Sequence, residues 1–237
     1  FPNVQECSQP LLSITVQDHL SRKIKVWGTK PYTNNRDDVE YVLCNGEEHL
    51  LRCFLDYWIT NFPDILTGWN VELYDVPYIC GRLERLFGEK EMKQISPWGI
   101  VHRDEMEIKG RQQIIYNMYG INVVDYLDLY RKFTYTNQES YRLDHIAFVE
   151  LGQRKLDHNE FENFKDFYTK DWQKFIDYNI LDVELVTRLE DKMKLIELAI
   201  ALAYDAKVNI RDVYYQVRMW DTIIYNFLKD KGVVVPP

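Results

Sequence analysis

The segment 65–88 constrains the fold of this chain more than any other part of the sequence. Residues 65–68 form a short apolar run typical of a buried strand, and a helix is predicted over 75–87. Asp75 suits the N-cap of this helix, and Gly88 suits its C-terminal stop. Asp75 should therefore lie just beyond the carboxyl end of a strand, which is where open α/β sheets bind their ligands.

A second segment, Phe175 to Val186, is predicted to be helical because it lacks Gly and Pro and spaces its apolar residues at helical intervals. Tyr178 and Asp182 are four residues apart, so their Cβ atoms should lie roughly 5–6 Å from each other on one face. A carboxylate can hold a hard cation, while a phenolic hydroxyl can orient a water or a phosphate oxygen. Alone, the pair is equally explained as a hydrogen bond on a helix surface.

The remaining pattern indicates strands followed by strands mixed with helices, which is typical of an α/β fold with a mixed central sheet flanked by helices. Alternating residues from 100 to 121, around Lys109-Gly110, predict an extended β-hairpin. The other predicted elements are strands over 11–16, 23–27, 39–43 and 122–124, and helices over 47–62, 125–133, 141–151, 170–206 and 214–231.

Composition narrows the function classes. The chain has 237 residues, of which 46% are hydrophobic, and a formal net charge of −8. That charge argues against a duplex binder that neutralises phosphates, but it allows an enzyme that takes only a strand end and balances charge with metal ions. The four cysteines form no C-x-x-C pair and indicate buried thiols in a reducing, cytoplasmic setting. No apolar run approaches the ~20 residues of a membrane span, so we expect no membrane partner.

The two segments together point to a metal site. Asp75 and Asp182 are distant in sequence, and no Cys or His-x-x-His lies near them, which favours oxygen ligation of Mg²⁺ or Mn²⁺. Asn70 can donate and accept hydrogen bonds at the same strand end, or it can simply shape the turn. Asp75 could equally be a helix cap with no further role. Dinucleotide, P-loop and serine-hydrolase motifs are absent from the sequence.

At this point the motifs resemble a known family. Gly68-Trp69-Asn70-x-x-x-Tyr74-Asp75-Val76-Pro77-Tyr78 resembles the second exonuclease motif of family B DNA polymerases, and Tyr178-Asn179-x-x-Asp182 resembles the third. The likeness is closest to the replicative polymerases of large tailed bacteriophages and covers nearly the whole chain. Further stretches of the sequence also resemble this family, namely 125–133, 136–141, 151–155, 207–208 and 222–226.

The resemblance implies an RNase H-like (DnaQ-like) fold and a 3′→5′ exonuclease that proofreads DNA during replication with two metal ions. Asp75 and Asp182 match metal-binding positions, and Tyr178 matches the residue that orients the attacking water. Lys155 matches a lysine near the same site, although it could be an ordinary surface lysine. Residues 1–206 would form the exonuclease domain, and 207–237 a C-terminal helix that leads toward the polymerase palm.

The resemblance also implies partners. Asn70 and Tyr74 would contact the substrate, a single-stranded 3′ end of DNA, although Tyr74 could instead belong to the core. The stretch 105–119 resembles a hairpin that helps to move a primer end to the nuclease, with an ordinary surface hairpin as its alternative. The palm and N-terminal domain of the polymerase would be partners, as would a sliding clamp. A viral protein of this kind would work in the host cell cytoplasm.

One departure from the family is important. The first exonuclease motif, an Asp-x-Glu on the opening strand, does not occur before Phe1-Pro2-Asn3-Val4, so we expect the piece alone to be weakly active or inactive. Glu6 or Asp125 would have to complete the site if it is active. The palm's Asp-Thr-Asp is also absent. The alternative is a catalytically silent RNase H-like scaffold or DNA-guiding module. An RNA-directed nuclease is disfavoured because the matching sequence motifs are specific to polymerases.

Overall fold

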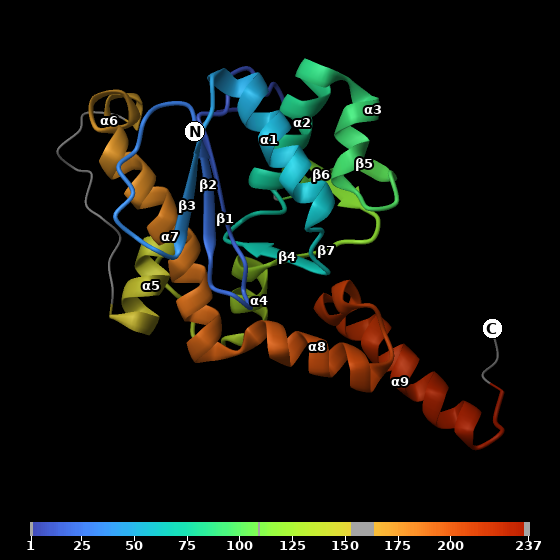
Figure 1. The fold of residues 1–237 in the computed structure, drawn as a ribbon. Helices are drawn as coiled ribbons and strands as arrows, with labels where there is room; N and C mark the ends of the chain where they lie inside the picture. Colours follow the sequence, from blue (N-terminus) through green and yellow to red (C-terminus); the bar gives the residue numbers. More distant parts are fainter. Residues whose placement is uncertain (1, 109, 153–163, 235–237) are drawn as a thin grey trace.

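The computed structural model describes residues 2–108, 110–152 and 164–234. The chain combines strands and helices, with all its strands before α4 and only helices after β7 in the described residues (Figure 1), which confirms the α/β class. In chain order the elements are β1 (Ser13–Gln17), β2 (Ile24–Gly28), β3 (Val39–Leu43), α1 (Gly46–Thr60), β4 (Ile65–Gly68), α2 (Asp75–Phe87), α3 (Glu89–Met92), η1 (Lys93–Ile95), β5 (Val101–Ile108), β6 (Arg111–Met118), β7 (Asn122–Asp125), α4 (Tyr126–Phe133), α5 (Leu143–Leu151), α6 (Phe164–Lys170), α7 (Trp172–Met193), α8 (Leu195–Ala206), η2 (Ile210–Tyr214) and α9 (Gln216–Asp230).

The strands form small separate sheets, so the expectation of one mixed central sheet is wrong for the described residues. β1 pairs antiparallel with β2, and β2 pairs parallel with β3. β4 pairs parallel with β7 in a second sheet. No ladder joins β1 to β4 within the part of the chain that the structure describes, and both strands line the same groove. β4 is consequently only half-buried, not buried as its apolar sequence predicts.

β5 and β6 pair antiparallel from Val101 opposite Met118 to Ile108 opposite Arg111, as the alternating pattern predicts. β6 contributes Ile114, Ile115 and Tyr116 to the buried interior, whereas residues 102–107 of β5 are exposed. The hairpin is therefore anchored to the core through one strand and open to solvent along the other.

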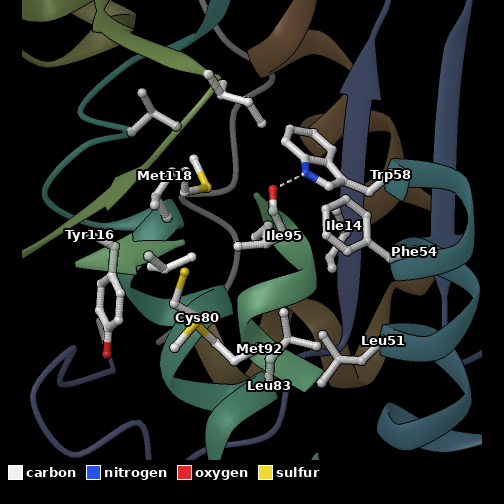
Figure 2. Packing of buried hydrophobic residues seen from close by; sticks show 14 of the residues in the cluster. Ile14, Leu51, Phe54, Trp58, Cys80, Leu83, Met92, Ile95, Tyr116 and Met118 are labelled. Carbon is white, nitrogen blue, oxygen red and sulfur yellow. Dashed lines mark hydrogen bonds between the residues drawn. The ribbon is translucent and has the colours of Figure 1, made fainter. Parts of the chain in front are cut away.

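A hydrophobic core lies beneath α1 and α2 (Figure 2). Leu51, Phe54 and Trp58 recur at helical spacing on α1; Leu51 points toward Leu83 of α2, and Phe54 lies beside Ile14 of β1. The indole Nε1 of Trp58 donates a hydrogen bond of 2.8 Å to the carbonyl of Ile95 in η1, so its buried polar atom is satisfied. This packing fixes α2, and with it the first turn that contains Asp75.

The long helix expected over 170–206 is broken into α7 and α8. Lys194 lies between them in the left-handed region, at φ 57°. The buried carboxylate of Glu190 accepts hydrogen bonds from the backbone N–H groups of Ile196 (3.1 Å) and Glu197 (3.3 Å) in the first turn of α8. A side chain thus caps the second helix, and no Gly or Pro in the sequence marks the break.

α8 and α9 extend from the body of the molecule toward the C-terminus (Figure 1). α9 begins at Gln216, two residues later than expected, because η2 occupies 210–214. None of the side chains of α9 is buried. No helix among the described residues combines the length and apolar character needed to cross a bilayer.

Candidate active site

A groove of about 2660 Å³ runs along the edges of β1 and β4. Five of the six site residues predicted from the sequence line it, namely Asn70, Tyr74, Asp75, Tyr178 and Asp182. They come from the β4–α2 loop, the first turn of α2 and the middle of α7. The sixth, Lys155, lies outside the described residues. The structure therefore brings together side chains that are more than a hundred positions apart in sequence.

Asp75 is the first residue of α2, and its side chain does not cap the helix. The N-cap position belongs to Tyr74, and no side-chain capping hydrogen bond is present there, so the predicted capping role of Asp75 is wrong. The residue has exposed surface and lines the groove, while protein surrounds its carboxyl group. The pKa of Asp75 is raised to about 7. The main cause is desolvation of its carboxyl group by the surrounding protein, and the nearby charges of Asp125 and Asp182 contribute to the rise. A divalent cation would stabilise the ionised form of this group.

Asp182 and Tyr178 lie one turn apart on α7, and both are half-buried at the groove. The ring of Tyr178 meets the buried Phe167 edge to face, with centroids 5.8 Å apart. This contact fixes the ring, because Phe167 has no exposed surface. The effect of the Asp182 charge on the pKa of Asp75 places the two carboxyl groups within electrostatic reach of each other.

The loop between β4 and α2 is held by hydrogen bonds to its backbone. Asn70 adopts a left-handed conformation, at φ 65°, which asparagine tolerates better than most residues. Its N–H donates to Asp125 Oδ1 at 3.0 Å, and the N–H of Glu72 donates to Asp125 Oδ2 at 3.1 Å. The Glu72 carboxylate in turn pairs with Arg211 of η2. The loop is thus tied to β7 on one side and to the C-terminal segment on the other.

Two aromatic residues of the same loop have different surroundings. Tyr74 stacks on Tyr78 at 6.1 Å with an interplanar angle of 21°, and burial raises its pKa to about 12, so its hydroxyl stays protonated. Trp69 packs against Tyr126 and Tyr130 and donates its indole N–H to the carbonyl of Tyr141. Both residues line the groove, but Trp69 also packs against the hydrophobic core, whereas Tyr74 lies next to Asp75.

Asp125 is the residue whose role the sequence does not reveal. It is 3% exposed, and it accepts hydrogen bonds from three backbone N–H groups, those of Asn70, Glu72 and Leu127. Its oxygens are therefore committed to holding two loops together. Glu6 is exposed and is not among the residues that line the groove. Asp125 is likewise not among the residues that line the groove.

Comparison with known proteins shows the family to which the chain belongs. Residues 12–146 match the model of the DNA polymerase family B exonuclease domain. The chain belongs to that family. The DNA-directed DNA polymerase of Escherichia phage RB69 is 34% identical over the whole chain, and that of Enterobacteria phage T4 is 36% identical over 84% of it. The DNA polymerase of Orgyia pseudotsugata multicapsid polyhedrosis virus is 28% identical over 67% of the chain.

The family B exonuclease domain is one part of a larger protein in these relatives. The chain spans 29% of the length of the phage RB69 polymerase and 22% of that of phage T4. The matched residues 12–146 contain Asn70, Tyr74 and Asp75, while Tyr178 and Asp182 lie beyond them, within the reach of the alignment to the phage RB69 polymerase.

Proposed function

We propose that this chain is the proofreading 3′→5′ exonuclease domain of a DNA-directed DNA polymerase, with an RNase H-like fold. The observation that supports this most directly is the meeting of Asp75 and Asp182 at one groove, from two separate helices. The family supports the same assignment. Its substrate is the single-stranded 3′ end of DNA, and the phage relatives suggest that it works in the cytoplasm of a host cell.

Asp75 and Asp182 hold divalent ions, Mg²⁺ or Mn²⁺, through carboxylate oxygens, which are the ligands that these hard cations prefer. When bound, two such ions supply a water nucleophile and stabilise the leaving oxygen of the terminal phosphodiester. The hydroxyl of Tyr178 orients the attacking water, and its ring is held by Phe167. Asn70 and Tyr74 contact the terminal nucleotide from the loop beside Asp75. Lys155 keeps a proposed role near the same site.

Two carboxylates are few for two ions, and the groove indicates where further ligands enter. β1 and β4 both present an edge to it. Three of their hydroxyl groups are buried with no hydrogen-bond partner among the described residues: Ser13 Oγ, Thr15 Oγ1 and Thr67 Oγ1. We propose that one more strand, with the Asp-x-Glu of the first exonuclease motif, pairs between them. Such a strand would join the two sheets into a single one and add two carboxylates beside Asp75.

Adding this strand to the chain tests the proposal. The chain extended at its N-terminus by a strand with Asp-x-Glu should degrade a 3′-labelled single strand with Mg²⁺, while the chain alone should be nearly inactive. The extension should also reduce self-association in light scattering, because it covers two sheet edges. Equal activity with and without the extension would contradict the proposed strand.

The C-terminal segment supports a connection to the rest of a polymerase. α9 exposes five large apolar side chains, which would be covered by a further domain: Val217, Trp220, Ile224, Tyr225 and Phe227. We propose that residues 207–237 lead from the exonuclease domain, residues 1–206, to the palm. A sliding clamp would contact the polymerase elsewhere.

The β5–β6 hairpin is proposed to guide a primer end toward the groove. Its β5 strand is exposed from 102 to 107, so it can meet DNA without disturbing the core. Shortening it around Gly110 in a complete polymerase should slow excision from duplex primers more than from single strands. Equal losses on both substrates would favour an ordinary surface hairpin.

The alternative function is a silent scaffold or DNA-guiding module, and Asp182→Ala in the complete polymerase separates it from a nuclease. Excision of a 3′-labelled single strand should be abolished, while polymerisation stays largely intact. Asp191→Ala is a matched control, because Asp191 is on the same helix but pairs with Arg22 in solvent. Excision at the wild-type rate by the Asp182→Ala protein would contradict the proposed site.

A further inference from the structure

Cys44, His49 and Cys53 form a compact group at the junction of β3 and α1. One ligand atom from each, the two thiol sulfurs and a ring nitrogen, lie within 4.8 Å of one another. The group is not among the residues that line the groove of Asp75 and Asp182, and the exonuclease chemistry does not use it. We propose that these three residues bind one thiophilic divalent ion, Zn²⁺ in the first instance.

The local fold presents the three ligands to one point. His49 and Cys53 are four residues apart on α1, so they share one face of the helix. Cys44 follows β3 directly, and its backbone N–H donates to the carbonyl of Gly28 in β2 at 2.8 Å. The sheet therefore fixes one sulfur and the helix fixes the other two ligands. An ion at this point would join the end of the sheet to the first turns of α1.

The three proposed ligands differ in how far they are buried. Cys44 is 1% exposed, Cys53 is half-buried, and His49 is exposed. An ion can therefore enter from the His49 side and keep one position toward solvent. Three protein ligands with a water in the fourth position is an established arrangement for Zn²⁺, and two thiolates with one imidazole is one of its ligand sets.

The charge of such a site suits its position. Two thiolates neutralise a divalent ion, so the bound group adds no net charge beside the N-terminus of α1, where a bare cation would be disfavoured. The donor type also separates this site from the groove, because sulfur and nitrogen select Zn²⁺ while carboxylate oxygens select Mg²⁺ or Mn²⁺. The chain would then hold two classes of metal in two places.

The hydrogen bonds already present show what metal binding must replace. The backbone N–H of Asn45 donates to His49 Nδ1 at 2.9 Å, which places the lone pair of the neutral ring on Nδ1. The thiol of Cys44 contacts the carbonyl of Val42 at 3.5 Å, a weak bond. An ion displaces the amide from Nδ1 or shifts the ring to its other tautomer, and it takes both thiols as thiolates.

Titration of the untagged, reduced chain with Zn²⁺ and Co²⁺ tests the proposal. We expect one Zn²⁺ per chain, a rise in the melting temperature on binding, and a thiolate-to-metal absorption band with Co²⁺. Mutation of a residue that only hydrogen-bonds to a metal ligand typically costs 10–100-fold in metal affinity. Cys53→Ser and His49→Gln each remove a proposed ligand itself, so each should weaken Zn²⁺ binding by at least about 100-fold.

Cys7→Ser is the matched control. The thiol of Cys7 donates to the carbonyl of Val4 at 3.0 Å, a bond that a serine hydroxyl can also make, and Cys7 is not part of the cluster. Zn²⁺ binding that Cys53→Ser and His49→Gln leave unchanged would overturn the proposal. A second result would also overturn it: the reduced chain gives no Co²⁺–thiolate band, and air oxidation joins Cys44 to Cys53 by a disulfide. The two cysteines would then form a redox pair and not a metal site.

Discussion

Two strand-to-helix junctions of this molecule are built alike and use their aspartates differently. β4 leads to α2 and β7 leads to α4, and the two strands are parallel neighbours, with Gly68 opposite Asp125 in the ladder. Asp75 and Asp125 both stand at the start of a helix near the same sheet edge. Asp125 is buried and accepts three backbone N–H groups, whereas Asp75 faces the groove and caps nothing.

The difference shows what makes a carboxylate available to a ligand. Both aspartates have a raised pKa, about 6 for Asp125 and about 7 for Asp75, and burial is the main cause in each case. For Asp125, hydrogen bonds from the Glu72 and Asn70 backbones oppose the rise, because they favour the charged form. For Asp75, the neighbouring charges of Asp125 and Asp182 add to it. Asp75 accepts from its own backbone N–H, but it lies among like charges, and an acid in that position is well suited to a cation.

The largest effect should come from Asp75→Ala in a complete polymerase. Because it removes a proposed metal ligand, worth several kcal/mol of transition-state stabilisation, we expect excision to fall by at least about 10³-fold. Polymerisation and folding should be retained. Excision from a 3′-labelled single strand, measured beside primer extension, checks this. If Asp125→Asn lost as much excision as Asp75→Ala while remaining as stable as wild type, the distinction between the two junctions would be wrong.

Tyr178→Phe should have a smaller effect on the same reaction. The substitution keeps the ring contact with Phe167 and removes only the hydroxyl that we propose to orient water, so we expect excision to slow by about 10²-fold. The Mg²⁺ concentration for half-maximal rate should not change, because no ligand is lost. A shift in that concentration would indicate that Tyr178 supports the metal site itself.

Asp125→Ala tests the structural role of Asp125, and the quantity to measure is the free energy of unfolding. It leaves three N–H groups without their acceptor, one of them in the buried first turn of α4, so we expect a loss of about 2–3 kcal/mol in the free energy of unfolding. Urea denaturation of the chain measures this directly. Asp75→Ala should not destabilise the chain under the same conditions. Equal losses for the two variants would show that Asp75 also has a structural role.

The Glu72–Arg211 pair offers a finer test of how the loop is held. Arg211 also donates to Asn117 of β6, so one side chain links η2, the hairpin and the loop before Asp75. Arg211→Lys keeps the charge but loses the planar fork that reaches two acceptors. We expect a loss of roughly 1 kcal/mol in unfolding free energy and a rise in KM for excision, with kcat nearly unchanged. A fall in kcat alone would place the effect at the reacting groups.

Local patterns predicted most elements, but they could not predict how the two sheets relate. The strand–turn–helix unit around Asp75 depends only on residues that are close in sequence, and the helix predicted over 75–87 agrees with both ends of α2. The separation of β1 from β4 depends on pairing between distant segments, which no local pattern encodes. The break at Lys194 depends on Glu190 reaching forward to α8, so a strong helical pattern hid it. For the site, the motif spacing named Asp75 and Asp182, while the structural role of Asp125 required its contacts.

The smallest effect concerns stability and pH. The pKa of Asp75 is raised in the folded chain to about 7 from an ordinary value of 3.8, so the folded state binds more protons than the unfolded state between those values. Stability that is present at pH 4 should therefore be lost as the pH rises toward 7. Asp75→Asn removes this loss, and the variant should be as stable as wild type at pH 4 and more stable at pH 8.

Because Asp75 has exposed surface at the groove, solvent screens part of its charge, and we expect a gain of only about 1 kcal/mol for Asp75→Asn at pH 8. For a chain of this length that corresponds to roughly 2–4 °C in melting temperature. Thermal melts of both proteins at pH 4 and pH 8 measure it. Adding Mg²⁺ at pH 8 should narrow the gap, since a cation offsets the repulsion only in wild type. An Asn variant that is no more stable than wild type at pH 8 would mean that Asp75 ionises without penalty, and the two junctions would then differ in geometry alone.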